Sequence, residues 1–281
     1  MSVKIIVDSS SDIGIERAKE LGLIFKPMKT YFGEKEFLDG INLTHTQFYD
    51  MLENSGYHPT TSQITPFEYE EIFKEATADG SDAVYIALSS KFSGSCNNAK
   101  MVAEDFDGKV FVIDSFNVAV GEQLLILDAV KMRDEGKTAK EIYEVLQPKA
   151  HKARLVAVMD TLKYLKKGGR ISAAEAIAGE LLNIKPVVTV EKGAVATLGK
   201  ARGQRKGLEM LRSYIDKFNP DFSDICTLAY TGVDPTGAEL FLEQNADLFE
   251  NFGFVPTPCT IGGTIGTHIG PGTVAIAFYE K

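Results

Sequence analysis

The chain has 281 residues, of which 44% are hydrophobic and 25% charged, and its 39 acidic against 30 basic side chains give a net charge of -9. These values are typical of a globular protein with two domains, and they argue against a nucleic-acid partner, whose phosphates need clustered Lys and Arg. Three dispersed cysteines, no signal-peptide core and no apolar stretch approaching about 18 residues lead us to expect a cytoplasmic protein without a disulfide framework or a zinc site.

Strands and helices alternate over the first half of the chain. In chain order the patterns predict strands at 3–7, 82–88 and 109–113, and helices at 13–21, 46–53, 66–80, 120–135 and 139–151. Thr65 followed by Pro66 has the residue types that begin a helix, whereas residues 28–60 lack a long periodic segment and are expected to form an irregular excursion. We predict an α/β/α domain over residues 1–153, with a parallel sheet covered by helices on both faces.

The stretch 87–99 combines a strand end, a hydroxyl-rich turn and the start of a helix. The turn contains Ser89, Ser90, Ser93, Gly94 and Ser95. Backbone N–H groups without partners and the positive end of the helix dipole make such a turn suitable for an anion. The alternative is that Ser93 or Ser95 only caps the helix. In a parallel sheet, ligands bind beyond the carboxyl ends of the strands, where this turn and residues 8–9 and 114–115 are expected to emerge.

The pattern changes after about residue 153. It predicts strands at 155–159, 187–190, 194–198, 225–230, 254–261 and 273–278, and helices at 162–167, 173–182, 205–218 and 236–249. The turn Glu191-Lys192-Gly193 joins the second and third of these strands as a hairpin. We therefore predict a second domain over residues 154–281, a two-layer α/β domain with a mixed sheet, and a ligand site in the cleft between the domains.

Several common catalytic motifs are absent. Gly136-Lys137-Thr138 ends like a nucleotide-binding P-loop, but the required first glycine is replaced by Lys131. Ser93 lacks the glycines of a nucleophile elbow. A Ser-His triad stays open, because triads are defined by geometry rather than by spacing.

A second glycine-rich stretch, 261–272, surrounds His268. Glycines let the backbone come close to a ligand, so this stretch could frame one. The alternative is a loop in which His268 has a structural role only.

Taken in order, these motifs resemble those of the DegV family over essentially the whole chain. They are Thr61-Ser62-Gln63 with Pro66; Ser89-Ser90-x-Phe92-Ser93-Gly94-Ser95 with Asn97 and Ala99; Asp114-Ser115; Leu165-x-x-Gly168-Gly169-Arg170-Ile171; and Gly266-x-His268-x-Gly270-Pro271-Gly272. The resemblance implies a two-domain α/β protein that binds a long-chain fatty acid. It further implies a non-catalytic subunit of bacterial fatty acid kinase, which presents the acid to an ATP-dependent kinase subunit of the dihydroxyacetone-kinase type for phosphorylation to acyl phosphate in phospholipid metabolism.

The resemblance also assigns roles to individual residues. The fatty-acid carboxylate is expected at Thr61, Ser93, Gly94 and His268, supported from behind by Ser62, Ser95 and Asp114, and the kinase is expected to dock at Arg170 and Arg202. The alternative for the two arginines is that they are ordinary solvated charges. No cofactor or metal is implied, and transient membrane contact is compatible with this interpretation.

Two other classes of function stay open from the sequence. One is a stand-alone acyl hydrolase or transferase with Ser93 as its nucleophile. The other is a lipid buffer or transport protein without a kinase partner. Neither the preferred acyl chain nor the oligomeric state can be read from the residues.

Overall fold

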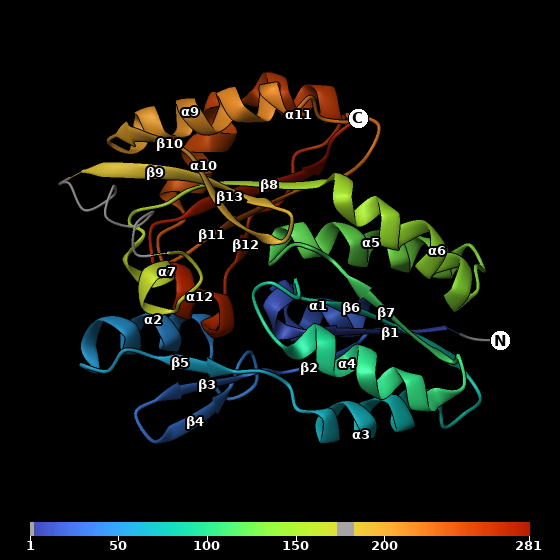
Figure 1. Cartoon of the computed structure of the whole chain (residues 1–281). Helices are drawn as coiled ribbons and strands as arrows, with labels where there is room; N and C mark the ends of the chain where they lie inside the picture. The colour runs from blue at the N-terminus through green and yellow to red at the C-terminus, as the bar shows by residue number, and fades with distance from the viewer. Residues whose placement is uncertain (1–2, 173–182) are drawn as a thin grey trace.

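The computed structural model describes residues 3–172 and 183–281, so the predicted helix over 173–182 lies outside the described residues. Figure 1 shows two main sheets stacked in layers with helices between them and on both outer faces. The first sheet belongs to the blue and green part of the chain, and the second to the yellow and red part.

The first sheet is parallel, as predicted, with the strand order β2-β1-β6-β7. Its strands are β1 (Val3–Asp8), β2 (Ile24–Lys26), β6 (Asp82–Ala87) and β7 (Val110–Asp114). Its helices are α1 (Ile15–Glu20), α3 (Pro66–Thr77), α4 (Ser95–Ala103), α5 (Val120–Asp134) and α6 (Ala139–Lys149). α3 and α4 cover one face and α1 and α5 the other. The short edge strand β2 was not predicted.

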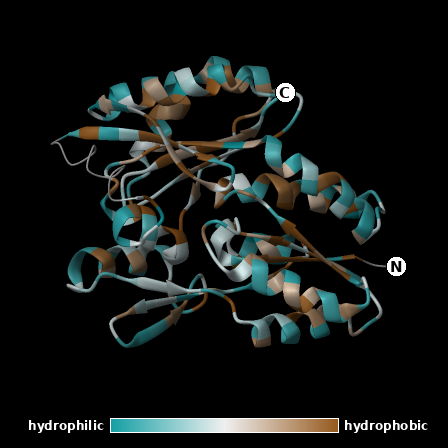
Figure 2. Cartoon of the chain, viewed as in Figure 1, coloured by the Kyte–Doolittle hydropathy of each residue, from teal (hydrophilic) through white to brown (hydrophobic). Residues whose placement is uncertain are grey.

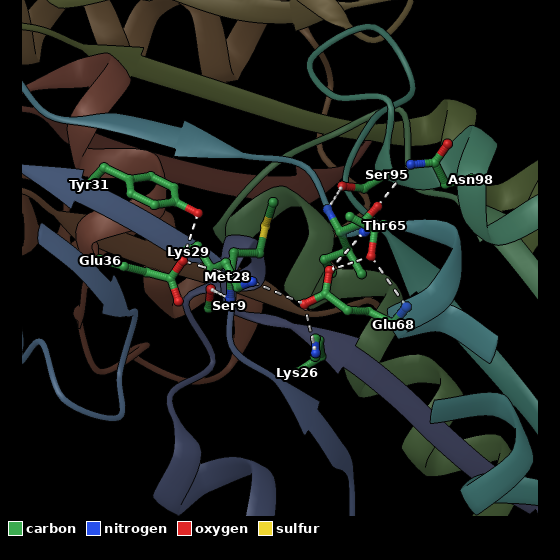
Figure 3. Close-up of polar contacts among 11 residues, drawn as sticks. Ser9, Lys26, Met28, Lys29, Tyr31, Glu36, Thr65, Glu68, Ser95 and Asn98 are labelled. Atoms are coloured by element: carbon green, nitrogen blue, oxygen red, sulfur yellow. Dashed lines mark hydrogen bonds and ion pairs between the residues drawn. The ribbon is translucent and has the colours of Figure 1, made fainter. Parts of the chain in front are cut away.

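The start of α3 is fixed as the sequence suggested. Thr65 and Glu68 form a capping box, in which the Thr65 hydroxyl accepts from the Glu68 N–H and the Glu68 carboxylate accepts from the Thr65 N–H. The carboxylate also pairs with Lys26 of β2 at 3.2 Å (Figure 3). The beginning of α3 is thereby tied to the edge of the first sheet.

Residues 28–60 are more regular than expected. β3 (Lys29–Phe32), β4 (Lys35–Leu38) and β5 (Thr60–Ser62) form a small antiparallel sheet in the order β4-β3-β5, and α2 (His45–Asn54) lies beside it. The predicted short helix is therefore confirmed, but the prediction of an irregular path was wrong. The strands are only three or four residues long, too short for a period-two pattern to stand out.

The second sheet is mixed, with the order β10-β9-β8-β13-β11-β12. Its strands are β8 (Ala153–Val158), β9 (Ile184–Glu191), β10 (Ala194–Arg202), β11 (Cys226–Tyr230), β12 (Cys259–Thr260) and β13 (Val274–Tyr279). The helices of this half are α7 (Lys163–Lys167), α9 (Gln204–Lys217), α10 (Thr236–Gln244), α11 (Ala246–Phe252) and α12 (Gly263–Ile269). The β9–β10 hairpin is confirmed, and α9, α10 and α11 cover the outer face.

One prediction for this half was wrong. The helix expected over 236–249 is two helices separated at Asn245, whose side chain donates to the Phe241 carbonyl and ends the first of them. The glycine-rich stretch 261–272, for which a loop was the alternative, contains α12, whose buried glycines pack closely against their neighbours.

A continuous apolar core joins the two sheets. α5 lies between them and packs against β1 and β6 on one side and β8, β11 and β13 on the other. In Figure 2 many residues in the strands of the two main sheets and part of α5 are brown, which marks them as hydrophobic. The chain enters the second sheet with β8, which begins at Ala153. The division of the chain into two domains at this residue stays a prediction.

Candidate functional site

A cavity of about 370 Å³ lies between residues of the first half of the chain, such as Ser93, and residues of the second half, such as His268. The residues predicted for the site that line it are Thr61, Ser62, Ser93, Gly94, Arg170 and His268. They come from β5, from the turn before α4, from the segment after α7 and from α12. The structure therefore brings four separate motifs of the sequence together at one cavity.

The turn before α4 is closed by its own hydroxyl groups. Ser93 Oγ accepts from the Ser95 N–H at 3.2 Å and lies 3.0 Å from Ser95 Oγ. A Cβ on Gly94 would overlap with the side-chain oxygen of Gln63, so the glycine lets the Gln63 side chain lie directly against this turn. Ser93 does contact the start of the helix, as the capping alternative required, but it also lines the cavity.

The segment that carries Thr61 is held by α4. Ser95 Oγ accepts from the Ile64 N–H at 3.0 Å, and the Asn98 side chain donates to the Ile64 carbonyl at 2.9 Å (Figure 3). Ser95 is fully buried and does not line the cavity. It therefore fixes the position of Thr61 relative to Ser93 from behind.

Asp114 also lies behind the cavity. Its buried carboxylate accepts from the Ser90 N–H at 3.3 Å and from the Phe116 N–H at 3.0 Å. These two bonds connect the turns that follow β6 and β7. Asp114 thus shapes the hydroxyl-rich turn and does not line the cavity itself.

His268 projects from the last turn of α12 towards Thr61, and its Nε2 atom lies 2.9 Å from Thr61 Oγ1. Burial, with a smaller contribution from the nearby Arg170 cation, lowers the pKa of His268 to about 4. The imidazole is therefore neutral at pH 7. His268 bonds to Thr61 and Ser93 lies against Ser95, and among the described residues no hydrogen bond joins Ser93 to His268 as in the Ser–His pair of a hydrolase.

Gly168 packs directly against the imidazole, and a Cβ at this position would overlap with His268 Nδ1. We expect Gly168→Ala to push the ring away from Thr61 and to lower the affinity for a ligand carboxylate by about tenfold, the effect of losing one hydrogen bond to a charged group. The matched control is Gly169→Ala, because Gly169 has φ +70° but no atom of the described residues lies within 4 Å of its Cβ position. That variant is expected to lose stability and keep its affinity. Equal affinity losses in both variants would contradict the inference that Gly168 lets the His268 ring reach Thr61.

Arg170 lies at the rim of this cavity rather than on an open surface. Its guanidinium donates to the Phe92 carbonyl at 3.2 and 3.3 Å and also to the Gly168 carbonyl. It thus links the hydroxyl-rich turn to the segment after α7. Arg202, the other arginine predicted for docking, is exposed at the end of β10 and does not line the cavity.

A second, apolar cavity of about 60 Å³ adjoins the first. The two share the lining residues Val118, Leu165, Val195, Ile265 and Ile269. The sequence analysis identified none of them as site residues.

Small side chains make room for the second cavity on the inner face of the second sheet. Ala157 of β8, Ala275 of β13 and Ala229 of β11 are paired in register across three neighbouring strands, and all three line the cavity. Their alignment depends on the strand register, which the sequence alone does not show. Together the cavities form a polar entrance that leads into an apolar interior.

Within residues 3–172 and 183–281, no group of three or more His, Cys, Asp or Glu side chains is arranged to hold a metal ion. No helix in the same part of the chain has the length and apolar composition needed to cross a membrane.

Comparisons with known proteins agree over the full length of the chain. A DegV domain-containing protein of Caldanaerobacter subterraneus subsp. tengcongensis is 32% identical over 284 residues, which cover 99% of each chain. A solved structure described as fatty acid binding of a DegV family protein from Thermus thermophilus has a TM-score of 0.88 and 26% identity, with 100% of both chains covered. A stearic acid-binding protein from Eubacterium ventriosum has a TM-score of 0.84 and 26% identity, covering 100% of this chain and 99% of that one.

The family model that matches is described as an uncharacterised protein of the DegV family, and it spans residues 2–281. This match covers every segment that contributes to the two cavities. The chain therefore belongs to the DegV family.

Proposed function

We propose that this protein binds a long-chain fatty acid, with the carboxylate at Thr61, Ser93, Gly94 and His268 and the acyl tail along the apolar lining of the first cavity and on into the second. The observation that carries the proposal is the juxtaposition of two hydroxyls and a neutral imidazole with an apolar interior. The fatty-acid-binding relatives of similar fold support it.

The two ends of the ligand contribute differently. Hydrogen bonds from hydroxyl, imidazole and backbone N–H groups to a carboxylate contribute about 1.5 to 3 kcal/mol each. Burying about fourteen methylenes at roughly 0.8 kcal/mol each contributes on the order of 11 kcal/mol before the ordering costs of binding. Affinity thus comes mainly from the tail, and the carboxylate sets the position of the ligand.

The same proposal makes the protein a non-catalytic subunit that presents the carboxylate to a separate ATP-dependent kinase. A positioned and partly desolvated carboxylate can attack a γ-phosphate, and the chain has no P-loop of its own. Arg202 is exposed and available for docking, while Arg170 would act from the rim of the cavity. We place this activity in the cytoplasm, where free thiols such as those of the three cysteines persist.

Extraction of bound lipid tests the binding step. Protein purified from a bacterial host is expected to release a long-chain fatty acid detectable by mass spectrometry. Ser93→Ala and Thr61→Ala are each expected to weaken the binding of added palmitate by about tenfold, because each removes one donor to the carboxylate. Ser223→Ala is the control and should leave affinity unchanged, because Ser223 is exposed and its hydroxyl donates to Asp221, away from the cavity.

Other outcomes favour other functions. Absence of lipid, together with failure to bind added palmitate, would refute the proposal. Turnover of an acyl ester that Ser93→Ala abolishes would favour a hydrolase. Binding without acyl-phosphate formation alongside any kinase subunit of the same organism would favour a lipid buffer.

A further inference from the structure

The N-terminal N–H groups of α12, the helix that carries His268, are hydrogen-bonded by two carboxylates from the first half of the chain. Asp12 Oδ1 accepts from the Gly262 N–H at 2.7 Å. Asp39 accepts from two further N–H groups, those of Gly263 and Thr264, both at 2.8 Å. The first backbone donors of α12, which no residue of the helix can satisfy, are therefore bound by side chains more than two hundred positions earlier in the sequence.

Burying these acids is costly, so their position calls for a physical reason. Asp39 is only 2% exposed, and burial raises the pKa of both Asp12 and Asp39. No cationic side chain among the described residues pairs with either carboxylate. Their compensation is the set of N–H groups at the positive end of α12. A Ser or Asn at the start of α12 would satisfy one of those donors at lower cost, but it would not attach the helix to the first half of the chain.

A second contact reinforces the attachment. Ser9 Oγ lies 3.1 Å from Thr264 Oγ1 and also accepts from the Met28 N–H at 2.9 Å. Thr264 and Met28 both line the polar cavity. The start of α12 is thus joined to the wall that faces His268 and Thr61.

α12 is short and tightly seated, so a shift at its start reaches its end. It has seven residues, and His268 lies five positions after Gly263. On the side of α2, a Cβ at Gly266 would come within 2.5 Å of the Phe48 ring and 2.9 Å of the Tyr49 hydroxyl. The helix therefore lies flat on α2 and has little room to adjust along its length.

We propose that Asp39, assisted by Asp12, is a positioning residue for the carboxylate site, because it holds α12 in the position that lets His268 form its hydrogen bond with Thr61. This inference rests on the proposed fatty-acid binding. It makes Asp39 part of the site without contact to the ligand, since Asp39 does not line the cavity.

A double-mutant cycle between Asp39 and His268 separates positioning from general stability. Asp39→Asn keeps the shape of the side chain but can accept with one oxygen only. We expect it to weaken palmitate binding by about tenfold in the wild-type background and by less than about twofold in the His268→Ala background, because coupled residues are not additive. Asp234→Asn is the matched control: Asp234 accepts from the Thr236 N–H at 2.9 Å at the start of α10, so it is also a helix-capping carboxylate.

Each outcome of the cycle decides the inference. Equal losses for Asp39→Asn in both backgrounds, or the same loss in Asp234→Asn, would overturn it. If Asp39→Asn does not fold, Asp12→Asn enters the same cycle, with a shift of the His268 ring ¹⁵N resonances as the second readout. Failure of the wild-type protein to bind palmitate would refute the proposed function itself. The role of Asp39 is refuted separately, by a wild-type protein that binds palmitate and an Asp39→Asn loss that is the same with and without His268.

Discussion

Ala275→Phe is expected to lower the affinity for palmitate on the order of a hundredfold and to leave the affinity for a short acid such as butyrate unchanged. Ala275 lies in the middle of the row of three alanines on the floor of the apolar cavity. A phenyl ring there would take the place of about four methylenes of the tail, at roughly 0.8 kcal/mol each. Isothermal titration calorimetry with acids of increasing length measures the effect.

The series of acids serves as its own control. A misfolded variant would lose all binding, whereas a blocked cavity loses affinity only for acids long enough to reach Ala275. An unchanged affinity for palmitate in a folded Ala275→Phe protein would show that the tail lies elsewhere. Ala157→Phe, one strand further along the same row, is expected to repeat the pattern.

His268→Ala is expected to reduce acyl-phosphate formation with the kinase subunit by about a hundredfold, the typical effect of removing one positioned donor, while fatty-acid affinity falls by only about tenfold. The split arises because most of the affinity resides in the tail, whereas His268 holds the carboxylate. Because the pKa of His268 is about 4, this residue should add no pH dependence to the reaction between about pH 6 and 8. Coupled turnover and palmitate affinity are measured on the same preparation.

A contrasting variant distinguishes positioning from docking. Arg202→Glu should reduce coupled turnover with unchanged palmitate affinity, since Arg202 is exposed and outside the cavity. Full turnover in His268→Ala, or hydrolysis of ATP by the wild-type chain alone in the presence of palmitate, would show that the assignment of His268 is wrong.

Local sequence signals predicted most of the fold. Helix starts such as Thr65-Pro66 and the Glu191-Lys192-Gly193 hairpin depend on nearby residues, and both appear where expected. The small sheet of β3, β4 and β5 and the division at Asn245 were missed. Short strands carry too little periodicity, and an apolar pattern can continue through a helix break.

The candidate site was predictable only in part. The turn containing Ser93 and the glycine-rich stretch around His268 were singled out from their residue types, and Thr61 from the family resemblance; the structure brings all three to one cavity. The alanine row of the tail cavity and the role of Asp39 were not identified, because both depend on which distant segments become neighbours. Arg170 was predicted to dock a kinase, and that role stays a prediction; its place at the rim of the cavity depends on a contact with Phe92 that no local pattern encodes.

The position of α5 between the two sheets limits how a ligand can enter and leave. A hinge motion that moved the sheets apart would expose this helix, nine of whose residues are buried, and the large hydration penalty would make such an open state rare. We therefore expect an acyl chain to exchange by local rearrangement at the polar entrance, with the two sheets keeping their relative position. On this view the residence time of the ligand is set by the rim segments, and a change deep in the tail cavity alters equilibrium affinity without creating a new exit.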